Sequence, residues 1–360
     1  LIVVIHHSVC DGLSITSMIQ EVVQYYEAIV DSSTTASAEV NAGLPALQYR
    51  DYVEYEARAD TSKARAYWKD IFASAPETLD ALLDLPRPVL KDFRGSSVAM
   101  TLATPDASAF EAFCHAHNAT LYMGLVALVQ LLLARFANVG EVTLGTPVAG
   151  RPGAQFDKVV GPFVNTVALR QTVDCQQTFP KLLLQVRRRV LEGFQHQGLA
   201  FDELVTELGF AKDPSRSPLY DAMLGLTFAD EMALSFRDGA GAADIAGRAL
   251  RVHQAFSKVD LTFHFEKDSD GSLRLDLEYA TGVLLEATVR RLCDAWRLLA
   301  IALPRQPELA LGELALQSED DRRRLLEQVN ATARPYPQQS SLVELFRTTV
   351  QQCPDTSRAP

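Results

Sequence analysis

The sequence predicts an α/β protein whose helices and strands surround a mixed sheet. Of its 360 residues, 48% are hydrophobic and 22% are charged, which is typical of a globular protein with a sizeable core. Segments with helical spacing of apolar residues alternate with short β-branched or apolar runs. Because these segments follow no strict strand-helix-strand repeat, an α/β sandwich with a mixed sheet is favoured.

The first part of the chain predicts a strand, a loop and a long helix. The apolar run at residues 1–5 predicts a strand buried on both faces. Helical spacing then predicts a helix up to residue 30, with Ser14 as its N-cap. His6 and His7 therefore lie on a strand-to-helix loop, where a side chain can project into a cleft.

The remaining elements follow in order along the chain. Residues 31–43 are rich in Ser, Thr and Ala and predict a surface loop, and the proline-punctuated residues 76–88 predict a crossing between two lobes. Further helices are predicted at residues 47–58, 62–73, 106–117, 121–136, 178–194 and 284–303, and strands at residues 97–102, 141–146, 223–228, 259–265 and 273–279.

Both ends indicate a piece of a longer chain. The sequence starts without Met inside an apolar run that is too short for a signal peptide. Beyond Pro304 a charged helix is predicted at residues 318–329, followed by a linker signature at residues 330–337. The short amphipathic segment at residues 342–350 predicts the first element of another domain.

Composition excludes several classes of protein. No apolar run reaches the length of a membrane span and no lipidation motif is present, so no membrane association is expected. The net charge is −11, and the short arginine runs at residues 187–189 and 322–324 lie in helical patterns, so nucleic acid is not an expected partner. Five scattered cysteines predict neither a disulfide framework nor a zinc site and favour a reducing cytoplasm.

The run HHSVCDG at residues 6–12 carries the strongest chemical signal. Histidine exchanges protons near neutral pH, and Asp11 could orient the imidazole of His7 or pair with a cation that fixes the loop. A structural pair of histidines beside a turn is the alternative that these seven residues leave open. Metal binding is disfavoured because no second cluster of ligands follows.

The motif resembles the core signature of condensation domains of nonribosomal peptide synthetases, which are relatives of chloramphenicol acetyltransferase. Four later segments resemble further motifs of this family in the same order: residues 145–151, 160–170, 196–204 and 213–219. The chain departs from the family at Gly198-Leu199-Ala200, where an acidic residue and Pro are usual, and at Ser217, where Asn is common.

The resemblance implies a chloramphenicol-acetyltransferase-like, two-lobed α/β sandwich with mixed sheets and a truncated N-terminal lobe. Residues 1–75 would be the C-terminal part of the N-terminal lobe, and residues 76–315 the C-terminal lobe. Residues 316–339 would be an interdomain linker, and residues 340–360 the start of an adenylation domain.

The resemblance also implies amide formation between a carrier-bound acyl or peptidyl thioester and the amine of a carrier-bound amino acid. The partners would be upstream and downstream peptidyl carrier domains, whose phosphopantetheine arms hold the substrates, and the adjacent adenylation domain of the same chain. The domain needs no cofactor of its own. The alternative is a non-catalytic condensation-like module that binds carrier or partner domains.

Carried over residue by residue, the catalytic motif comprises His7, His6, Asp11 and Gly12. His7 would hold the amine, stabilise its developing positive charge or take its proton, with His6 as a structural neighbour. The N–H of Gly12 could approach the oxyanion, and Arg151 is the candidate ion-pair partner of Asp11.

Four tunnel or motif residues complete the predicted site, each with a structural alternative: Gly161, Phe163, Asn165 and His196. Gly161 could instead shape a turn, Asn165 could bond to backbone, and His196 could be a packing residue. His264, in an apolar strand without a motif, is interpreted as an ordinary sheet residue.

Related families fit less well. Epimerization domains usually carry Trp soon after the motif glycine, which Leu13-Ser14-Ile15 lacks. Heterocyclization domains replace the first histidine by Asp, and plant-type acyltransferases add a DFGWG string that does not occur in this sequence.

Overall fold

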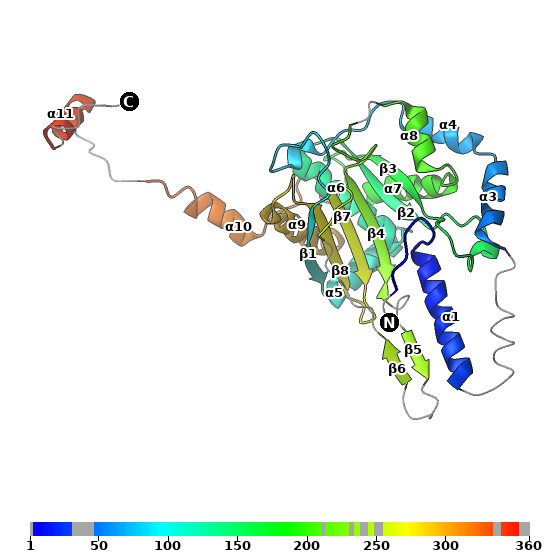
Figure 1. Cartoon of the computed structure of the whole chain (residues 1–360). Coiled ribbons are helices and arrows are strands. Elements are labelled where there is room, and N and C mark those ends of the chain that lie inside the picture. Colours follow the sequence, from blue (N-terminus) through cyan, green and yellow to red (C-terminus); the bar gives the residue numbers. More distant parts are fainter. Residues whose placement is uncertain are drawn as a thin grey trace. The chain divides into compact units, whose positions relative to one another are not determined.

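A six-stranded sheet with the order β1-β8-β7-β4-β2-β3 forms the centre of the fold (Figure 1). Its strands are β1 Gly95–Leu102, β2 Glu141–Val148, β3 Asn165–Thr172, β4 Ala222–Phe228, β7 Leu261–Lys267 and β8 Leu273–Ala280. Strands β2, β4 and β7 are parallel, whereas the β1–β8, β7–β8 and β2–β3 pairs are antiparallel. The prediction of an α/β fold with a mixed sheet is therefore confirmed.

The computed structural model describes residues 3–30, 47–210, 213–229, 234–237, 244–247, 255–333 and 340–352. The chain divides into two compact units, Leu1–Leu316 and Gln317–Pro360. The first unit contains the sheet. The second contains α10 Glu319–Arg323, the π-helical turn η4 Arg324–Gln328 and α11 Leu342–Gln352.

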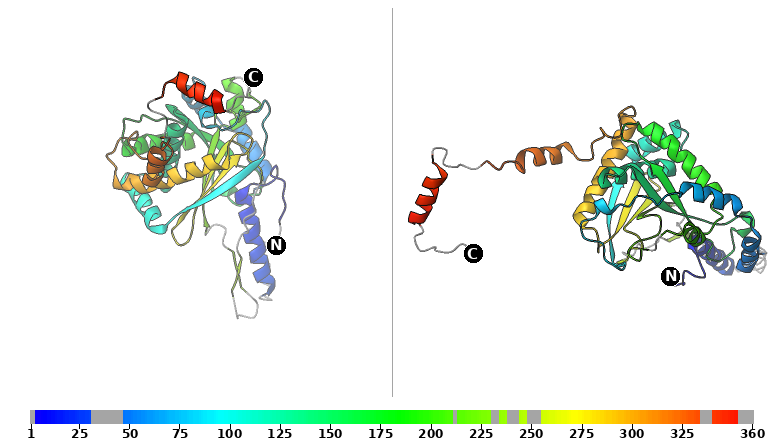
Figure 2. Two further views of the ribbon diagram at one scale, coloured as in Figure 1. Left: turned by 90° about the vertical axis from the view of Figure 1, so that its left-hand side faces the viewer. Right: turned by 90° about the horizontal axis from the view of Figure 1, so that it is seen from above.

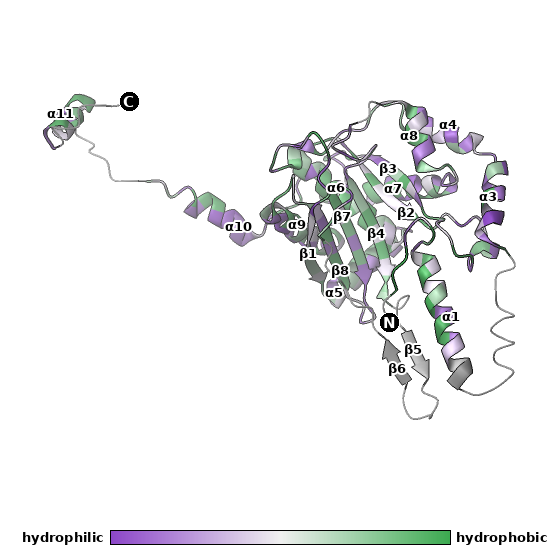
Figure 3. Ribbon diagram, viewed as in Figure 1, coloured by the Kyte–Doolittle hydropathy of each residue, from purple (hydrophilic) through white to green (hydrophobic). Residues whose placement is uncertain are grey.

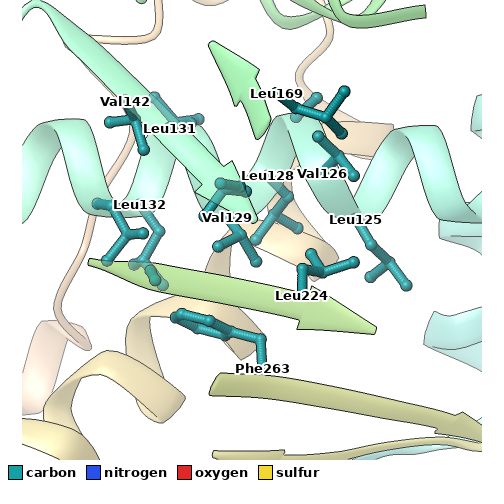
Figure 4. Close-up of a cluster of buried hydrophobic side chains, with 14 of the residues drawn as sticks. Leu125, Val126, Leu128, Val129, Leu131, Leu132, Val142, Leu169, Leu224 and Phe263 are labelled. Carbon is teal, nitrogen blue, oxygen red and sulfur yellow. The ribbon is translucent and has the colours of Figure 1, made fainter. Parts of the chain in front are cut away.

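One face of the sheet is covered by four helices: α5 Thr104–Ala116, α6 Leu121–Ala137, α7 Phe179–Gln195 and α9 Glu286–Arg305. The central one, α6, is apolar almost all round and nearly all of its residues are buried. Its leucines and valines pack against Val142, Leu224 and Phe263 of the sheet (Figure 4). Within the described ranges no single helix is both long and apolar enough to cross a membrane; only the bent α5–α6 pair passes that test, and α6 lies in the core.

The other helices in the described part of the first unit are α1 Gly12–Val30, α3 Tyr49–Arg58, α4 Ser62–Ile71, α8 Phe201–Leu208 and the short η1 Asp80–Leu82 and η2 Ala154–Phe156. Figure 3 shows α3 as mainly hydrophilic, in contrast to the strands β4 and β7. A separate antiparallel pair, β5 Leu234–Arg237 and β6 Asp244–Gly247, lies beside α1 (Figures 1 and 2).

Most predicted elements are present with boundaries within a few residues, including α1, α6 and the strands β1, β2, β4, β7 and β8. The strand β3, the helix α8 and the β5–β6 pair were not predicted. The loop expected at residues 31–43 and residues 334–337 of the expected linker lie outside the described residues.

The buried strand predicted at residues 1–5 is wrong for the part that the structure describes. Residues 3–5 form no strand, and Val4 is 90% exposed. An apolar run becomes a strand only when a neighbouring strand takes up its backbone hydrogen bonds. No described strand pairs with this segment.

Candidate active site

The loop that carries the histidines is fixed at its end by Asp11, which is 3% exposed. Oδ1 of Asp11 accepts the backbone N–H of Ser14 at 2.8 Å, and its carbonyl oxygen accepts the N–H of Ile15 at 3.0 Å. This is the geometry of an N-cap. Asp11 therefore caps α1, and the prediction of Ser14 as the cap is wrong, because the Ser14 side chain already lies inside the helix and has other partners.

Asp11 also forms a bidentate ion pair with Arg151, which follows β2. Nη1 of Arg151 donates to Oδ2 at 2.9 Å and Nη2 donates to Oδ1 at 3.1 Å, and both side chains are about 5% exposed or less. The backbone N–H of Phe163 donates to Oδ2 at 3.1 Å, and the Phe163 ring lies 4.3 Å from the guanidinium carbon. The carboxylate thus joins the histidine loop to two segments that lie 140 and 152 residues further along the chain.

Ser14 extends this network. Its hydroxyl oxygen lies 2.7 Å from Oδ1 of Asp11 and 3.0 Å from the carbonyl oxygen of Gly161, and it accepts the N–H of Gly161 at 3.1 Å. Nη2 of Arg151 reaches the same oxygen at 3.0 Å. Sequence reasoning missed the local contact between Ser14 and Asp11, although the Asp-x-x-Ser spacing at a helix start was a usable signal for it. We call Asp11, Ser14, Arg151 and Phe163 the loop anchor.

The loop anchor keeps Asp11 ionised. Burial raises the pKa of this carboxyl group, but hydrogen bonds from Arg151 and Ser14, together with the positive charge of Arg151, outweigh burial and hold the pKa below its ordinary value. A buried carboxylate with these donors is suited to a structural role. It has no lone pair left for a substrate that approaches from solvent.

The lowered pKa of Asp11 predicts how stability depends on pH. Since the folded-state pKa lies below the unfolded value, the ion pair stabilises the folded chain above about pH 4 and this contribution is lost as pH falls through the folded pKa. We expect the gap in melting temperature between wild type and Asp11→Asn to shrink below about pH 4. Thermal melts from pH 7 to pH 3 measure it; a gap that stays constant over this range contradicts the assignment.

Gly161 allows the loop before β3 to approach Tyr49 of α3 closely. A Cβ at this position would lie 2.0 Å from the Tyr49 ring, whose hydroxyl donates to the carbonyl oxygen of Pro162 at 3.2 Å. Tyr49 is packed edge-on against Phe163, with a ring-centroid distance of 5.2 Å, so it has little room to move. The glycine is thus required by a protein contact.

Gly161→Ala is expected to lower the free energy of unfolding by about 1–3 kcal/mol, because the added methyl group displaces the Tyr49 ring. Urea unfolding measures the change. Gly198→Ala is the matched control, since a Cβ there meets nothing within 4 Å, and should change stability by no more than about 0.5 kcal/mol. Equal effects of the two substitutions would show that the contact with Tyr49 is not restrictive.

The two histidines lie at the exposed turn that precedes Asp11 in the chain. Nδ1 of His6 accepts the N–H of Ser8 at 3.2 Å and lies 2.7 Å from its hydroxyl oxygen, so His6 is used locally. His7 is exposed and has no hydrogen bond or ion pair with any described residue. Both ring nitrogens of His7 are therefore available to a ligand.

Gly12 is the first residue of α1. Its N–H belongs to the first turn, where amide groups have no acceptor within the helix and the helix dipole is positive. A Cβ at Gly12 would meet nothing within 4 Å, so the position is open to solvent. The exposed His7 and this helix start are both adjacent to the buried loop anchor.

Asn165 and His196 are occupied by contacts within the protein. Nδ2 of Asn165 donates to the carbonyl oxygens of Gln197 and Leu199, each at 2.8 Å, and Oδ1 accepts the N–H groups of Thr166 and Phe201. Asn165 thus fastens the start of β3 to the loop between α7 and α8. The amide nitrogen of Asn165 donates to backbone carbonyl oxygens, which do not depend on the side chains around them. The unusual Gly198-Leu199-Ala200 sequence therefore leaves these bonds intact.

His196 ends α7. Its ring stacks on Tyr67 with a centroid distance of 4.4 Å, and its carbonyl oxygen accepts Nε1–H of Trp68 at 3.0 Å. These contacts correspond to the packing alternative given for His196 above. Among the described residues no cluster of His, Cys, Asp and Glu could hold a metal ion.

The family model for the condensation domain matches residues 1–326. The chain belongs to this family. Among curated proteins, it is 31% identical over 358 residues to surfactin synthase subunit 1 of Bacillus subtilis and 31% identical over 359 residues to tyrocidine synthase 2 of Brevibacillus parabrevis. Each comparison covers 97% of this chain but only 9% of the relative. This condensation domain is therefore comparable to a small part of a long synthetase.

Solved structures agree with this assignment at the level of the fold. A holo four-domain nonribosomal peptide synthetase bound to AMP and glycine has a TM-score of 0.80 at 22% identity, covering 98% of this chain and 27% of that one. The first condensation domain of the calcium-dependent antibiotic synthetase, in complex with a substrate analogue, has a TM-score of 0.69 at 20% identity, covering 87% of this chain and 66% of that one.

Proposed function

We propose that this condensation domain forms an amide bond between an acyl or peptidyl thioester and the amine of an amino acid, both bound to carrier domains. The observation that carries the proposal is the contrast within one short loop. Asp11 is buried and fully bonded, whereas His7, four residues earlier, is exposed and has no partner in the described chain. Such a loop holds a free imidazole on a rigid base.

The reaction begins when the acceptor amine attacks the carbonyl carbon of the donor thioester. A C–N bond forms, the tetrahedral intermediate collapses, the C–S bond breaks, and the thiol of the donor phosphopantetheine leaves. The amine loses one proton in this sequence. An α-amine has a pKa near 8, so part of it is neutral without a strong base. His7 then positions the amine, stabilises its developing positive charge, or takes the proton.

The developing oxyanion requires a hydrogen-bond donor. We propose the N–H of Gly12, because it belongs to the first turn of the 19-residue helix α1 and Gly12 is exposed. Its position next to Asp11 keeps this amide in a fixed place relative to His7. Asp11 itself acts through the loop anchor and does not touch the reacting atoms.

The proposal includes partners and neighbouring domains. Upstream and downstream carrier domains supply the two substrates on phosphopantetheine arms, and residues 340–360 begin an adenylation domain. Supporting this, the likeness to bacitracin synthase 2 of Bacillus licheniformis extends over 99% of this chain, beyond the condensation match that ends at residue 326. We also propose a cytoplasmic location, which the five scattered cysteines of the sequence favour.

We also propose the two-lobed chloramphenicol-acetyltransferase-like arrangement, with residues 1–75 in the N-terminal lobe, which would be incomplete in this chain, and residues 76–315 in the C-terminal lobe. The likeness to the condensation domain of the calcium-dependent antibiotic synthetase, which spans 87% of this chain and 66% of that structure, supports it.

The test compares product formation with carrier binding in the synthetase that contains this domain. With both carriers loaded, we expect a condensed product on the downstream carrier, detected by mass spectrometry after thioester hydrolysis. Omission of the donor acyl group is the control. Binding of both loaded carriers without any product would favour the non-catalytic module instead.

A further inference from the structure

A cavity of about 280 Å³ opens at the carboxyl ends of the three parallel strands β2, β4 and β7. Its wall includes Thr146, Gly225 and His264 from the three strands, and Tyr122 from the first turn of α6. In open α/β sheets, the carboxyl ends of parallel strands are the usual place for a ligand. This volume lies just below the range of about 300–1,000 Å³ that is typical of pockets for drug-sized ligands, so it suits a group of amino-acid size.

Gly225 keeps this cavity open. It lies in the middle of β4, where glycine weakens a strand and often marks close approach by another group. A Cβ at Gly225 would meet no protein atom within 4 Å, so no packing contact requires glycine there. Gly145 on β2 is different, because its Cβ would lie 2.6 Å from the Tyr220 ring. The space above Gly225 is therefore free for a ligand.

His264 is the polar side chain of the wall that makes no hydrogen bond with any described residue. The hydroxyl of Tyr122 donates to Thr146, at 2.7 Å, and Thr146 donates to the carbonyl oxygen of Leu224 at 2.9 Å. Thr227 donates to the carbonyl oxygen of Phe265 at 3.3 Å. His264 is exposed and has no partner among the described residues. His264 lies in the strand β7, as expected from the sequence, and its imidazole is open to a ligand.

The cavity and the loop anchor share one end of β2. Thr146 and Pro147 line the cavity, and Arg151, which holds Asp11, follows Pro147 by four residues, at most about 14 Å along the chain. On the neighbouring strand, Thr166 pairs with Pro147, and Phe163, three residues earlier, donates to Asp11. The cavity is thus within reach of a substrate group held at the histidine loop.

We propose that this cavity receives the side chain of one of the two carrier-bound aminoacyl groups and selects apolar or aromatic side chains that carry at most one hydrogen-bonding group. This inference rests on the proposed amide-forming function. The wall is mostly apolar and aromatic, its three hydroxyls donate to protein atoms, and the imidazole of His264 is the polar group that has no such bond among the described residues. Gly225 belongs to the lining, and the absence of a Cβ there leaves space for the bound side chain.

The test fills the cavity without disturbing its protein neighbours. Gly225→Val adds three carbon atoms where no contact exists, and Ala99→Leu adds three at an exposed site on the same sheet face, outside the cavity. Single-turnover rates are measured in the synthetase with donor or acceptor carriers loaded with phenylalanyl, leucyl or glycyl groups, varied one carrier at a time. If the rate depends on the group loaded on the donor carrier, the donor side chain occupies the cavity; if it depends on the group loaded on the acceptor carrier, the acceptor side chain does.

We expect Gly225→Val to lower the single-turnover rate with phenylalanyl and leucyl groups on one of the two carriers by about 10- to 200-fold relative to the rate with glycyl groups. Ala99→Leu should leave these rates at the wild-type values. Unchanged rates with phenylalanyl and leucyl groups would overturn the proposal. So would an equal loss of rate with glycyl and phenylalanyl groups, whichever carrier holds them.

A binding measurement separates failure of the cavity from failure of the function. Phenylalanyl-pantetheine amide is expected to shift the imidazole NMR signals of His264 in the wild type but not in Gly225→Val. If no product forms and this shift is present, the proposed function fails and the cavity stands. If product forms and the shift is absent, the cavity assignment is wrong.

Discussion

Replacement of His7 by alanine is expected to lower the rate of amide formation by about 10²–10⁴-fold while the melting temperature stays the same. The side chain is exposed and makes no hydrogen bond or ion pair with any described residue, so its removal leaves no buried group unsatisfied. Loss of positioning or of proton transfer would appear in the single-turnover rate with both carriers loaded.

His115→Ala is the control for this experiment. His115 is also exposed, lies on α5, and has only a long contact of 3.9 Å with Glu111. It is expected to keep both rate and stability. A His7→Ala protein that condenses at the wild-type rate would remove His7 from the mechanism, and one that unfolds would show a structural role instead.

The second large effect is on stability. Asp11→Ala is expected to lower the free energy of unfolding by about 3–5 kcal/mol, because it leaves the buried guanidinium of Arg151 without a counter-charge. The substitution also removes the N-cap of α1 and the acceptor of the Phe163 N–H. Urea unfolding, followed by circular dichroism, measures the change.

Glu286→Ala is the matched control for Asp11→Ala. Glu286 pairs with Arg290 one helical turn away, but both side chains are more than half exposed, and such pairs contribute about 0.3–0.5 kcal/mol. If Asp11→Ala destabilises the protein no more than this control, the loop anchor is not a structural ion pair.

The elements that sequence patterns predicted well are those whose burial is decided locally. The helix α6 is apolar along its whole length, and α1 shows a clear helical spacing, so both were predictable. β3 was missed because Arg170 and Gln171 interrupt its apolar residues; its pairing with β2 and the packing of α7 make it a strand. The strand prediction failed at residues 3–5 for the opposite reason, since these apolar residues have no described partner strand.

The site was predictable only where the family motifs carried it. The resemblance suggested that Asp11 pairs with Arg151, 140 residues away, and the structure contains this pair. No pattern could show that Ser14 joins Gly161, or that Tyr49 lies against Gly161, because both contacts depend on how distant segments pack. Likewise, the four backbone bonds of Asn165 follow from the path of the α7–α8 loop.

Attack of an amine on a donor thioester is the central claim, and the mass of the acceptor carrier tests it most directly. In the synthetase that contains this domain, one turnover should increase the mass of the loaded acceptor carrier by that of the donor acyl group less one hydrogen and leave a free thiol on the donor carrier. Acetylation of the acceptor amine should abolish this increase. Transfer that persists with the acetylated acceptor, or an acceptor mass that never changes, would contradict the account.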